Sequence, residues 1–268
     1  MPKYNDLDPR RWKEYGDINT DSLWIIEKRD NSGAHDGHYH GNFVPQIPNQ
    51  LLRRYTKEGE IVLDPFMGSG TTIIEAQRLK RNSIGVDLQQ SVVDEAVGRI
   101  CTERGESVKA LTYAGDSMTF DFSYPLKLLE SNTAQFIIYH PPYWDIIKFS
   151  NNPNDLSNSK SSVDFLHSFG KVIDNTAQYL DDNRYCAVVI GDKYANSRVD
   201  PLGFKVMSCF LERGFILKAI LVKNFGDTKG KKNQQGIWRY RAIMNDFYIF
   251  KHEYIFVFKK LGNGRLAV

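Results

Sequence analysis

Residues 61–72 read Ile-Val-Leu-Asp-Pro-Phe-Met-Gly-Ser-Gly-Thr-Thr, and this stretch decides the fold. A short apolar run ending in an acid precedes two closely spaced glycines and then helix-spaced apolar residues, which predicts a buried strand, a tight turn and a helix. Gly68 and Gly70 let the backbone pass close to a ligand. A phosphate-binding loop is excluded because Thr71 stands where a lysine would follow, and Ile73 replaces the third glycine of the dinucleotide fingerprint. A non-phosphorylated ligand fits better.

Other short runs rich in β-branched residues flank this segment and alternate with helix-like stretches. The expected strands cover residues 61–63, 83–86, 136–138, 185–190, 216–223 and 254–258, and the expected helices include 71–79 and 92–101. Such alternation predicts an α/β fold with a doubly wound, mostly parallel sheet. The last two strands are separated by a polar segment, residues 224–251, without a clear crossover helix, so we expect the last strand to pair antiparallel. Residues 148–162 and 225–246 are expected to be long loops with a functional role.

The composition is that of an ordinary globular protein, with 268 residues of which 41% are hydrophobic and 25% charged. A formal net charge of +3 permits an anionic partner but does not identify one. Cys101, Cys186 and Cys209 are far apart and lack zinc-ligand spacing, so free thiols and no metal site are expected. No apolar run approaches the length of a membrane span, and a cytoplasmic location is expected.

Two further acids follow predicted strands. Asp87 ends the strand after the glycine turn, where a carboxylate can accept hydrogen bonds from both hydroxyls of a ribose. Asp116 lies at the expected end of the next strand and could hold an adenine amino group. Each acid alone would be interpreted as a strand-end cap and each glycine as a turn residue. Their joint order favours a nucleoside-containing cofactor.

The wording Asp-Pro-Phe-x-Gly-Ser-Gly-Thr-Thr resembles the first motif of amino-methylating, site-specific DNA methyltransferases, which act on adenine N6 or cytosine N4. Upstream, residues 40–48 are similar to the family segment that packs on the methionine part of the cofactor. The resemblance implies a Rossmann-like class I methyltransferase fold and S-adenosyl-L-methionine as the cofactor. The residues implied to bind it are Phe43, Asp64, Pro65, Phe66, Gly68, Gly70, Thr71, Asp87 and Asp116.

A second string, Phe-Ile-Ile-Tyr-His-Pro-Pro-Tyr-Trp at residues 136–144, is again an apolar strand that runs into a polar tip. Pro141 and Pro142 have no amide hydrogens, so the carbonyls of this stiff loop are free acceptors. Acceptors aimed at an exocyclic amine would favour its reactive pyramidal form. Tyr143 would then stack on a base swung out of the duplex, with Trp144 in support.

This string resembles the family's Asp/Asn/Ser-Pro-Pro-Tyr/Phe/Trp motif but departs from it at the first position, which is His140. The implied catalytic residues are His140, Pro141, Pro142 and Tyr143. A neutral imidazole can accept a hydrogen bond as a carboxylate or amide oxygen would, whereas an imidazolium cannot. We therefore expect the rate to fall as the pH drops through the pKa of His140, about 6.5 if unperturbed.

Several alternatives stay open. Pro-Pro-Tyr alone is also an ordinary turn, and the loss of the usual first residue is compatible with a non-catalytic, methyltransferase-like DNA-binding subunit. RNA or protein-glutamine N-methyltransferases carry an Asn-Pro-Pro-Tyr type of motif but not the Asp-Pro-Phe wording. Cytosine C5 methylation is set aside, since none of the three cysteines follows a proline. Adenine is only slightly favoured over cytosine as the target base.

The segment before the last strand is basic and interleaved with aromatic and amide residues. We expect it to contact double-stranded DNA through phosphates and base edges, although a solvated basic loop is the plain alternative. The DNA-binding residues are predicted to be Lys229, Lys231, Lys232, Trp238, Arg239 and Arg241, with Lys223, Gln234, Gln235 and Tyr240 alongside.

The resemblance covers residues 23–260. It divides the chain into an N-terminal extension, residues 1–37, and a methyltransferase catalytic domain, residues 38–268, with a basic DNA-recognition insertion at about 224–251. Further partners compatible with the family are a restriction endonuclease, a second methyltransferase subunit or a second copy of the chain. Among the other histidines, only His40 lies in the cofactor-packing segment, and the rest are treated as structural.

Overall fold

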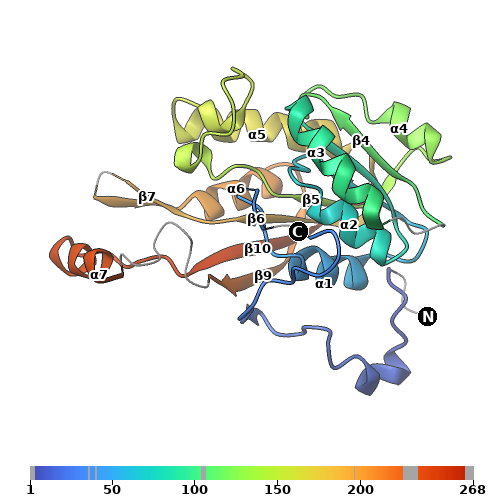
Figure 1. Cartoon of the computed structure of the whole chain (residues 1–268), viewed down its shortest axis with the longest axis horizontal. Coiled ribbons are helices and arrows are strands. Elements are labelled where there is room, and N and C mark those ends of the chain that lie inside the picture. Colours follow the sequence, from blue (N-terminus) through green and yellow to red (C-terminus); the bar gives the residue numbers. More distant parts are fainter. Residues whose placement is uncertain are drawn as a thin grey trace.

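A computed structural model of the chain describes residues 4–35, 37–39, 41–103, 107–195, 197–225 and 235–262. These residues form an eight-stranded sheet in the order β1-β9-β10-β6-β5-β2-β3-β4, with a small two-stranded sheet of β7 and β8 beside it (Figure 1). The strands are β1 (Leu23–Trp24), β2 (Ile61–Asp64), β3 (Asn82–Asp87), β4 (Ala110–Ala114), β5 (Ala134–Tyr139), β6 (Leu180–Ile190), β7 (Lys193–Ala195), β8 (Arg198–Asp200), β9 (Ile216–Asn224) and β10 (His252–Lys259).

The direction of the strands follows the sequence prediction. β4, β3, β2, β5 and β6 are parallel neighbours, and β10 lies antiparallel between β6 and β9. The doubly wound, mostly parallel sheet with an antiparallel last strand is therefore confirmed.

Helices cover both faces of the sheet, as expected for a parallel sheet whose strands are apolar on both sides. They are α1 (Gln46–Tyr55), α2 (Thr71–Arg78), α3 (Gln90–Ile100), α4 (Ser123–Leu128), α5 (Ser162–Ala177), α6 (Leu202–Leu211) and α7 (Gln235–Met244), with short 3-10 turns at Pro9–Glu14, Cys101–Glu103, Trp144–Ile146 and Leu156–Asn158. Successive residues of β5 point to opposite faces of the sheet. Ile137 and Tyr139 pack with α5 and α6, whereas Phe136 and Ile138 pack with α1. The central strand is thus fixed from both sides.

Three elements differ from the sequence prediction. α7 lies inside the segment expected to be a loop, where glycine and charged residues conceal the helical spacing of Ile237, Tyr240 and Met244. The other two are β1, which is only two residues long, and the hairpin of β7 and β8, whose strands have three residues each. Elements this short carry no periodicity that a sequence pattern can detect.

Two residues of the chain before residue 38 pair with the edge of the sheet as β1. Leu23 pairs with Val222 of β9 in the parallel sense, and Trp24 is buried against the α1 side of the core. The three cysteines are free thiols, with Cys186 and Cys209 buried and Cys101 exposed. Among the described residues, no helix combines the length and apolar character needed to cross a bilayer.

Candidate functional site

Four predicted site residues lie at the ends of neighbouring strands. Asp64 ends β2 and Asp87 ends β3, while Asp116 follows β4 and His140 follows β5. Because these strands are parallel neighbours, their carboxyl ends meet along one edge of the sheet. The direction of chain progression reverses between β2 and β5, which is where open α/β sheets place their ligands.

The glycine turn after β2 is held by the acid that ends β3. Asp87 accepts a hydrogen bond from the Gly68 amide through Oδ2 and one from the Gln89 amide through Oδ1, each at 3.0 Å. Gly68 and Gly70 both have positive φ, 50° and 84°. A Cβ at Gly70 would also lie 3.0 Å from Ile100 Cδ1. Glycine is therefore required here for backbone conformation and for close packing on α3.

Asp64 is a buried acid with an unused oxygen. Its Oδ1 accepts a hydrogen bond from the Phe66 amide at 3.0 Å, whereas Oδ2 is buried and has no hydrogen-bond partner within the described part of the chain. Burial raises the pKa of Asp64 to about 7, against the opposing influence of the nearby Thr72 hydroxyl and the Phe66 amide, and the charge of Asp87 adds to the rise. Burial also raises the pKa of Asp87. The site is thus able to accept a donor or a positive charge.

The remaining cofactor residues of the sequence prediction lie around this turn. Pro65 is buried and its carbonyl accepts a hydrogen bond from the Ser117 hydroxyl at 2.6 Å. The ring of Phe66 stacks on Phe169 of α5 with a centroid separation of 6.0 Å. Asp116 accepts a hydrogen bond from the Met118 amide at 2.9 Å, which is a turn-stabilising contact.

The N-terminal segment crosses over the glycine turn. Thr71 donates a hydrogen bond to Asn42 Oδ1 at 2.6 Å, and a Cβ on Gly68 would lie 3.2 Å from the ring of Tyr39. Phe43 is buried, and its ring meets the imidazole of His140 edge-on with a centroid separation of 4.5 Å. Sequence reasoning selected Phe43 but missed Tyr39 and Asn42, which stand in no recognisable spacing. His40 lies outside the described residues.

A buried polar cluster fastens the same segment to α2. His35 Nε2 lies 2.6 Å from Glu75 Oε1, and both side chains are buried. Asn49 of α1 donates to Glu75 Oε2 at 2.8 Å, and Arg78 donates to Glu75 Oε1 at 3.1 Å. Arg78 also bonds Glu103 at 2.6 Å. Glu75 therefore joins the N-terminal segment, α1 and α2.

The segment after β5 carries the predicted catalytic residues. Pro141 is buried, while Pro142, Tyr143 and His140 are half-buried. Burial, with a smaller contribution from the charge of Lys223, lowers the pKa of His140 to about 3. This lowered pKa argues against the expected fall in activity near pH 6.5, because desolvation favours the neutral form of the imidazole.

Tyr143 and Trp144 are both anchored by polar contacts. The Tyr143 hydroxyl donates to Glu253 Oε2 of β10 at 2.7 Å. The Trp144 indole donates to the Ser159 carbonyl at 2.8 Å, and Lys193 Nζ lies 3.8 Å from its ring centroid. Trp144 thus connects the predicted catalytic segment to the long loop at residues 148–162.

The predicted DNA-binding residues divide into two groups. Lys229, Lys231 and Lys232 lie outside the described residues. α7 exposes Arg239 and Arg241, and Trp238 is half-buried with the Arg241 guanidinium 5.5 Å from its ring.

Lys223 does not belong to the basic surface to which its sequence position assigned it. The side chain is only 5% exposed, and its Nζ pairs with Glu253 Oε1 at 3.1 Å. Lys223 and Glu253 lie directly opposite each other on antiparallel strands, where opposite charges stabilise the pair. The Lys223 ammonium therefore pairs with Glu253 rather than with a phosphate.

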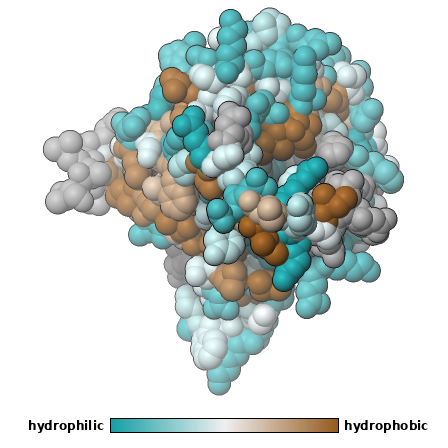
Figure 2. Space-filling view, turned by 90° about the vertical axis from the view of Figure 1, so that its left-hand side faces the viewer, coloured by the Kyte–Doolittle hydropathy of each residue, from teal (hydrophilic) through white to brown (hydrophobic). Residues whose placement is uncertain are grey.

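α7 and the β7–β8 hairpin project from one end of the molecule (Figure 1). Figure 2 shows this end, where apolar and hydrophilic side chains alternate over a small area. The exposed apolar residues of α7 are Ile237, Tyr240, Ile243 and Met244. The projecting helix therefore exposes both aromatic and basic side chains.

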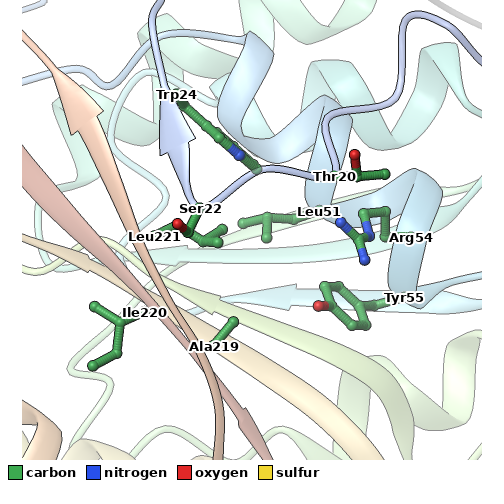
Figure 3. A pocket seen from close by; sticks show the side chains of 9 residues that line it. All are labelled: Thr20, Ser22, Trp24, Leu51, Arg54, Tyr55, Ala219, Ile220 and Leu221. Atoms are coloured by element: carbon green, nitrogen blue, oxygen red, sulfur yellow. The ribbon is translucent and has the colours of Figure 1, made fainter.

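A cavity of about 290 Å³ lies elsewhere, between the N-terminal segment, α1 and β9 (Figure 3). It is lined by Thr20, Ser22, Trp24, Leu51, Arg54, Tyr55, Ala219, Ile220 and Leu221. None of the predicted site residues lines it, so this cavity does not mark the motif site.

Comparison with known proteins finds a family match for the part of the chain that contains β2. A family model described as DNA methylase matches residues 2–98, which include the glycine turn and Asp87. The resemblance to the DNA methylase family is confirmed. The match to the DNA methylase model ends before His140, so the predicted catalytic motif lies outside the matched part.

Curated relatives of the DNA methylase family match over similar lengths. The chain is 43% identical to the type II methyltransferase M.MjaII of Methanocaldococcus jannaschii over 65 residues, 24% of this chain and 12% of that protein. It is 34% identical to M.MjaI of the same organism over 104 residues, 36% of this chain and 34% of that protein. M.Cfr9I of Citrobacter freundii is 31% identical over 96 residues, 36% of this chain and 30% of that protein. The matched part spans about a third or less of each relative.

Solved structures confirm the fold over most of the chain. TrmN from Thermus thermophilus superposes with a TM-score of 0.52 at 16% identity, over 82% of this chain and 49% of that one. A methyltransferase from Pyrococcus furiosus gives a TM-score of 0.50 at 13% identity, over 82% and 84%. The Rossmann-like methyltransferase fold is confirmed, as the sheet order indicated.

Proposed function

We propose that this protein transfers the methyl group of S-adenosyl-L-methionine to the exocyclic amino group of a base in DNA. The observation that carries the proposal is the meeting of two motifs at one sheet edge. The glycine turn, which the DNA methylase model matches, follows β2, and the His-Pro-Pro-Tyr segment follows the adjacent β5. Phe43, from the segment that crosses the glycine turn, contacts His140.

The residues present fit the proposed cofactor. Asp64 has a buried oxygen that no described residue contacts by a hydrogen bond, and burial raises the pKa of both Asp64 and Asp87, so a positively charged or hydrogen-bond-donating ligand would be favoured there. Asp87 at the tip of β3 would hold the ribose hydroxyls, and Asp116 the adenine amino group. Phe43, Pro65, Phe66, Gly68, Gly70 and Thr71 complete the proposed cofactor residues. When bound, the cofactor supplies an electrophilic methyl group on a sulfonium.

The catalytic segment would prepare the amine. A neutral His140 and the carbonyls around Pro141 and Pro142 accept hydrogen bonds from the amine, which turns its lone pair toward the methyl group. The ring of Tyr143, held through its hydroxyl by Glu253, is proposed to stack on the flipped base. We propose adenine N6 rather than cytosine N4 as the atom that is methylated.

The DNA side of the proposal uses the segment between β9 and β10. Arg239 and Arg241 are exposed on α7, and Trp238 and Tyr240 stand beside them. Arginines would neutralise phosphates, and aromatic rings would pack on sugar or base edges. We retain the division into an extension at residues 1–37 and a catalytic domain at 38–268 as part of this proposal.

The test is transfer of labelled methyl from S-adenosyl-L-methionine to mixed-sequence duplex DNA by the wild type and by His140→Ala. Nucleoside mass spectrometry of the product identifies the base. We expect methylated adenine or cytosine in the wild type and a rate at least about 100-fold lower in the variant, the order of loss seen when one group acting on the transition state is removed.

The same assay separates the rival functions. Methyl incorporation into RNA or protein but not into DNA would favour an RNA or protein-glutamine methyltransferase. DNA binding without any turnover, in both proteins, would favour a non-catalytic subunit.

A further inference from the structure

A chain of four polar side chains leads from β9 to the catalytic histidine. Lys223 Nζ lies 3.1 Å from Glu253 Oε1, and the Tyr143 hydroxyl lies 2.7 Å from Glu253 Oε2. His140 Nε2 lies 3.4 Å from the same Tyr143 hydroxyl. Lys223 and Glu253 are only 5% and 3% exposed, and they face each other directly in the β9–β10 ladder. The Lys223–Glu253 end of this series of contacts is therefore fixed within the sheet.

The chemistry of these groups fixes the direction of each hydrogen bond. An ammonium only donates and an ionised carboxylate only accepts, so Glu253 must accept from both Lys223 and Tyr143. The single hydroxyl hydrogen of Tyr143 is then used, and its oxygen can only accept from His140 Nε2. That nitrogen must carry the hydrogen. Because a neutral imidazole has one N–H, the lone pair stands on Nδ1.

We propose that Glu253 and Tyr143 are positioning residues that select the Nε2–H tautomer of His140 and so make Nδ1 the hydrogen-bond acceptor for the target amine. This inference rests on the proposed function, since it assigns the accepting atom of the same site. The T-shaped contact between the Phe43 ring and the imidazole restrains the plane in which that atom lies.

The opposite tautomer would hinder the reaction. An Nδ1–H group would donate toward the amine and engage the lone pair that has to attack the methyl group. The family motif avoids this with a carboxylate, amide or hydroxyl oxygen at the first position. A histidine has two chemically distinct nitrogens, so it needs a neighbour that decides between them. Glu253, acting through Tyr143, selects the nitrogen of His140 that carries the hydrogen.

The tautomer can be read directly in the whole chain. Protein labelled with ¹⁵N-histidine gives long-range ¹H–¹⁵N correlations that distinguish a protonated nitrogen from one with a lone pair, and His140→Asn assigns the signals. We expect Nε2–H in the wild type. In Glu253→Gln, the new amide can donate to the Tyr143 oxygen, whose hydrogen then turns toward Nε2, so the Nδ1–H form should become populated.

A second variant guards against misfolding, since Glu253→Gln leaves Lys223 without its buried counter-charge. The pair Lys223→Met with Glu253→Gln removes both charges and should populate the Nδ1–H form in the same way. Tyr254→Phe removes a hydroxyl from the next residue of β10, which bonds Asp192 and His252, and should leave the His140 signals unchanged. We expect kcat of the double variant to fall about tenfold while KM changes little.

The two proposals fail separately. The NMR experiment needs no methyl transfer, so Nδ1–H in a wild type that methylates DNA overturns the tautomer inference and leaves the proposed function intact. Nε2–H in a wild type that never methylates DNA contradicts the proposed function instead. An unchanged Nε2–H signal in both Glu253 variants also overturns the role given to Glu253.

Discussion

Asp64 and His140, at the ends of adjacent strands, respond to the same physical cause with opposite shifts. Removing water disfavours the charged form of either group, so the pKa of the acid rises and that of the imidazole falls. Both side chains are therefore pushed toward neutrality at the edge where the two motifs meet. The two shifts have separate consequences, one for stability and one for activity.

For Asp64, the folded protein holds a proton that the unfolded chain has released, between the ordinary pKa of 3.8 and the raised value of about 7. Stability from this group is present at low pH and is lost as the pH rises through that window. The free energy of unfolding of wild type minus that of Asp64→Asn should thus fall between pH 4 and 7. At about 1.4 kcal/mol per pKa unit, the fall reaches at most about 4 kcal/mol.

Urea unfolding of both proteins without cofactor, at a series of pH values, measures this difference. A constant difference across the window would show that Asp64 is ionised in the folded protein.

For His140, the lowered pKa predicts that its accepting nitrogen is available throughout the neutral range. The ratio of the wild-type rate constant to that of His140→Asn should therefore stay constant between about pH 5.5 and 8, since asparagine does not titrate and other groups cancel in the ratio. Single-turnover methylation at saturating DNA provides the measurement. A ratio that falls with a midpoint near pH 6.5 would mean that the histidine is exposed to water.

Among the elements, the N-terminal segment is held onto α2 through Glu75. Replacing Glu75 with glutamine weakens the buried contacts to His35 and Arg78, and we expect a loss of about 1–3 kcal/mol in the free energy of unfolding. Glu95→Gln on α3 is the matched control, because its partner Arg99 lies 3.6 Å away and Glu95 is exposed. That change should cost less than about 1 kcal/mol. Equal losses in the two variants would show that Glu75 is no special anchor.

At α7, the prediction concerns DNA affinity. If Arg239 and Arg241 each neutralise one phosphate, the double change to alanine should lower the salt slope of log K by about 2. Arg10, exposed on the 3-10 turn Pro9–Glu14, provides a control whose replacement should leave the slope unchanged. Fluorescence anisotropy with a short duplex at several salt concentrations measures both. An unaltered slope in the double variant would remove α7 from the DNA-binding surface.

Elements whose structure depends only on neighbouring residues could be predicted from the sequence, whereas contacts that depend on distant residues could not. β2 and β3 are short buried apolar runs that end in Asp64 and Asp87, and β5 is one that His140 follows, so the local pattern alone located these strands and the sheet edge that they share. Neither the pairing of Glu253 with Lys223 nor the contact of Glu253 with Tyr143 could be predicted, since they depend on a strand register far away in sequence. α7 was hidden because its helical spacing lies among glycine and charged residues.

For the molecule as a whole, cofactor binding should appear as added stability. S-adenosylhomocysteine, the product form, at 100 times its Kd should raise the free energy of unfolding by about 2.7 kcal/mol and Tm by several degrees. Asp87→Ala removes both the proposed ribose ligand and the brace of the glycine turn, and should abolish the shift. Asp121→Asn, an exposed acid that accepts from the Ser123 amide, should keep it. Thermal unfolding of the three proteins with and without S-adenosylhomocysteine measures the shift in Tm.

The pairing of β1 with β9 has a consequence for biosynthesis. Leu23 leaves the ribosome well before its partner Val222, which emerges only after β2, β3, β5 and β6 have been made. Contacts between such distant residues form late, because the long intervening loop must close first. The segment that follows β1 and crosses the glycine turn therefore gains its anchor at the sheet edge only after β9 has been made. In a nascent chain that ends before β9, the contact of His35 with Glu75 of α2 is available to hold this segment, whereas the pairing of Leu23 is not.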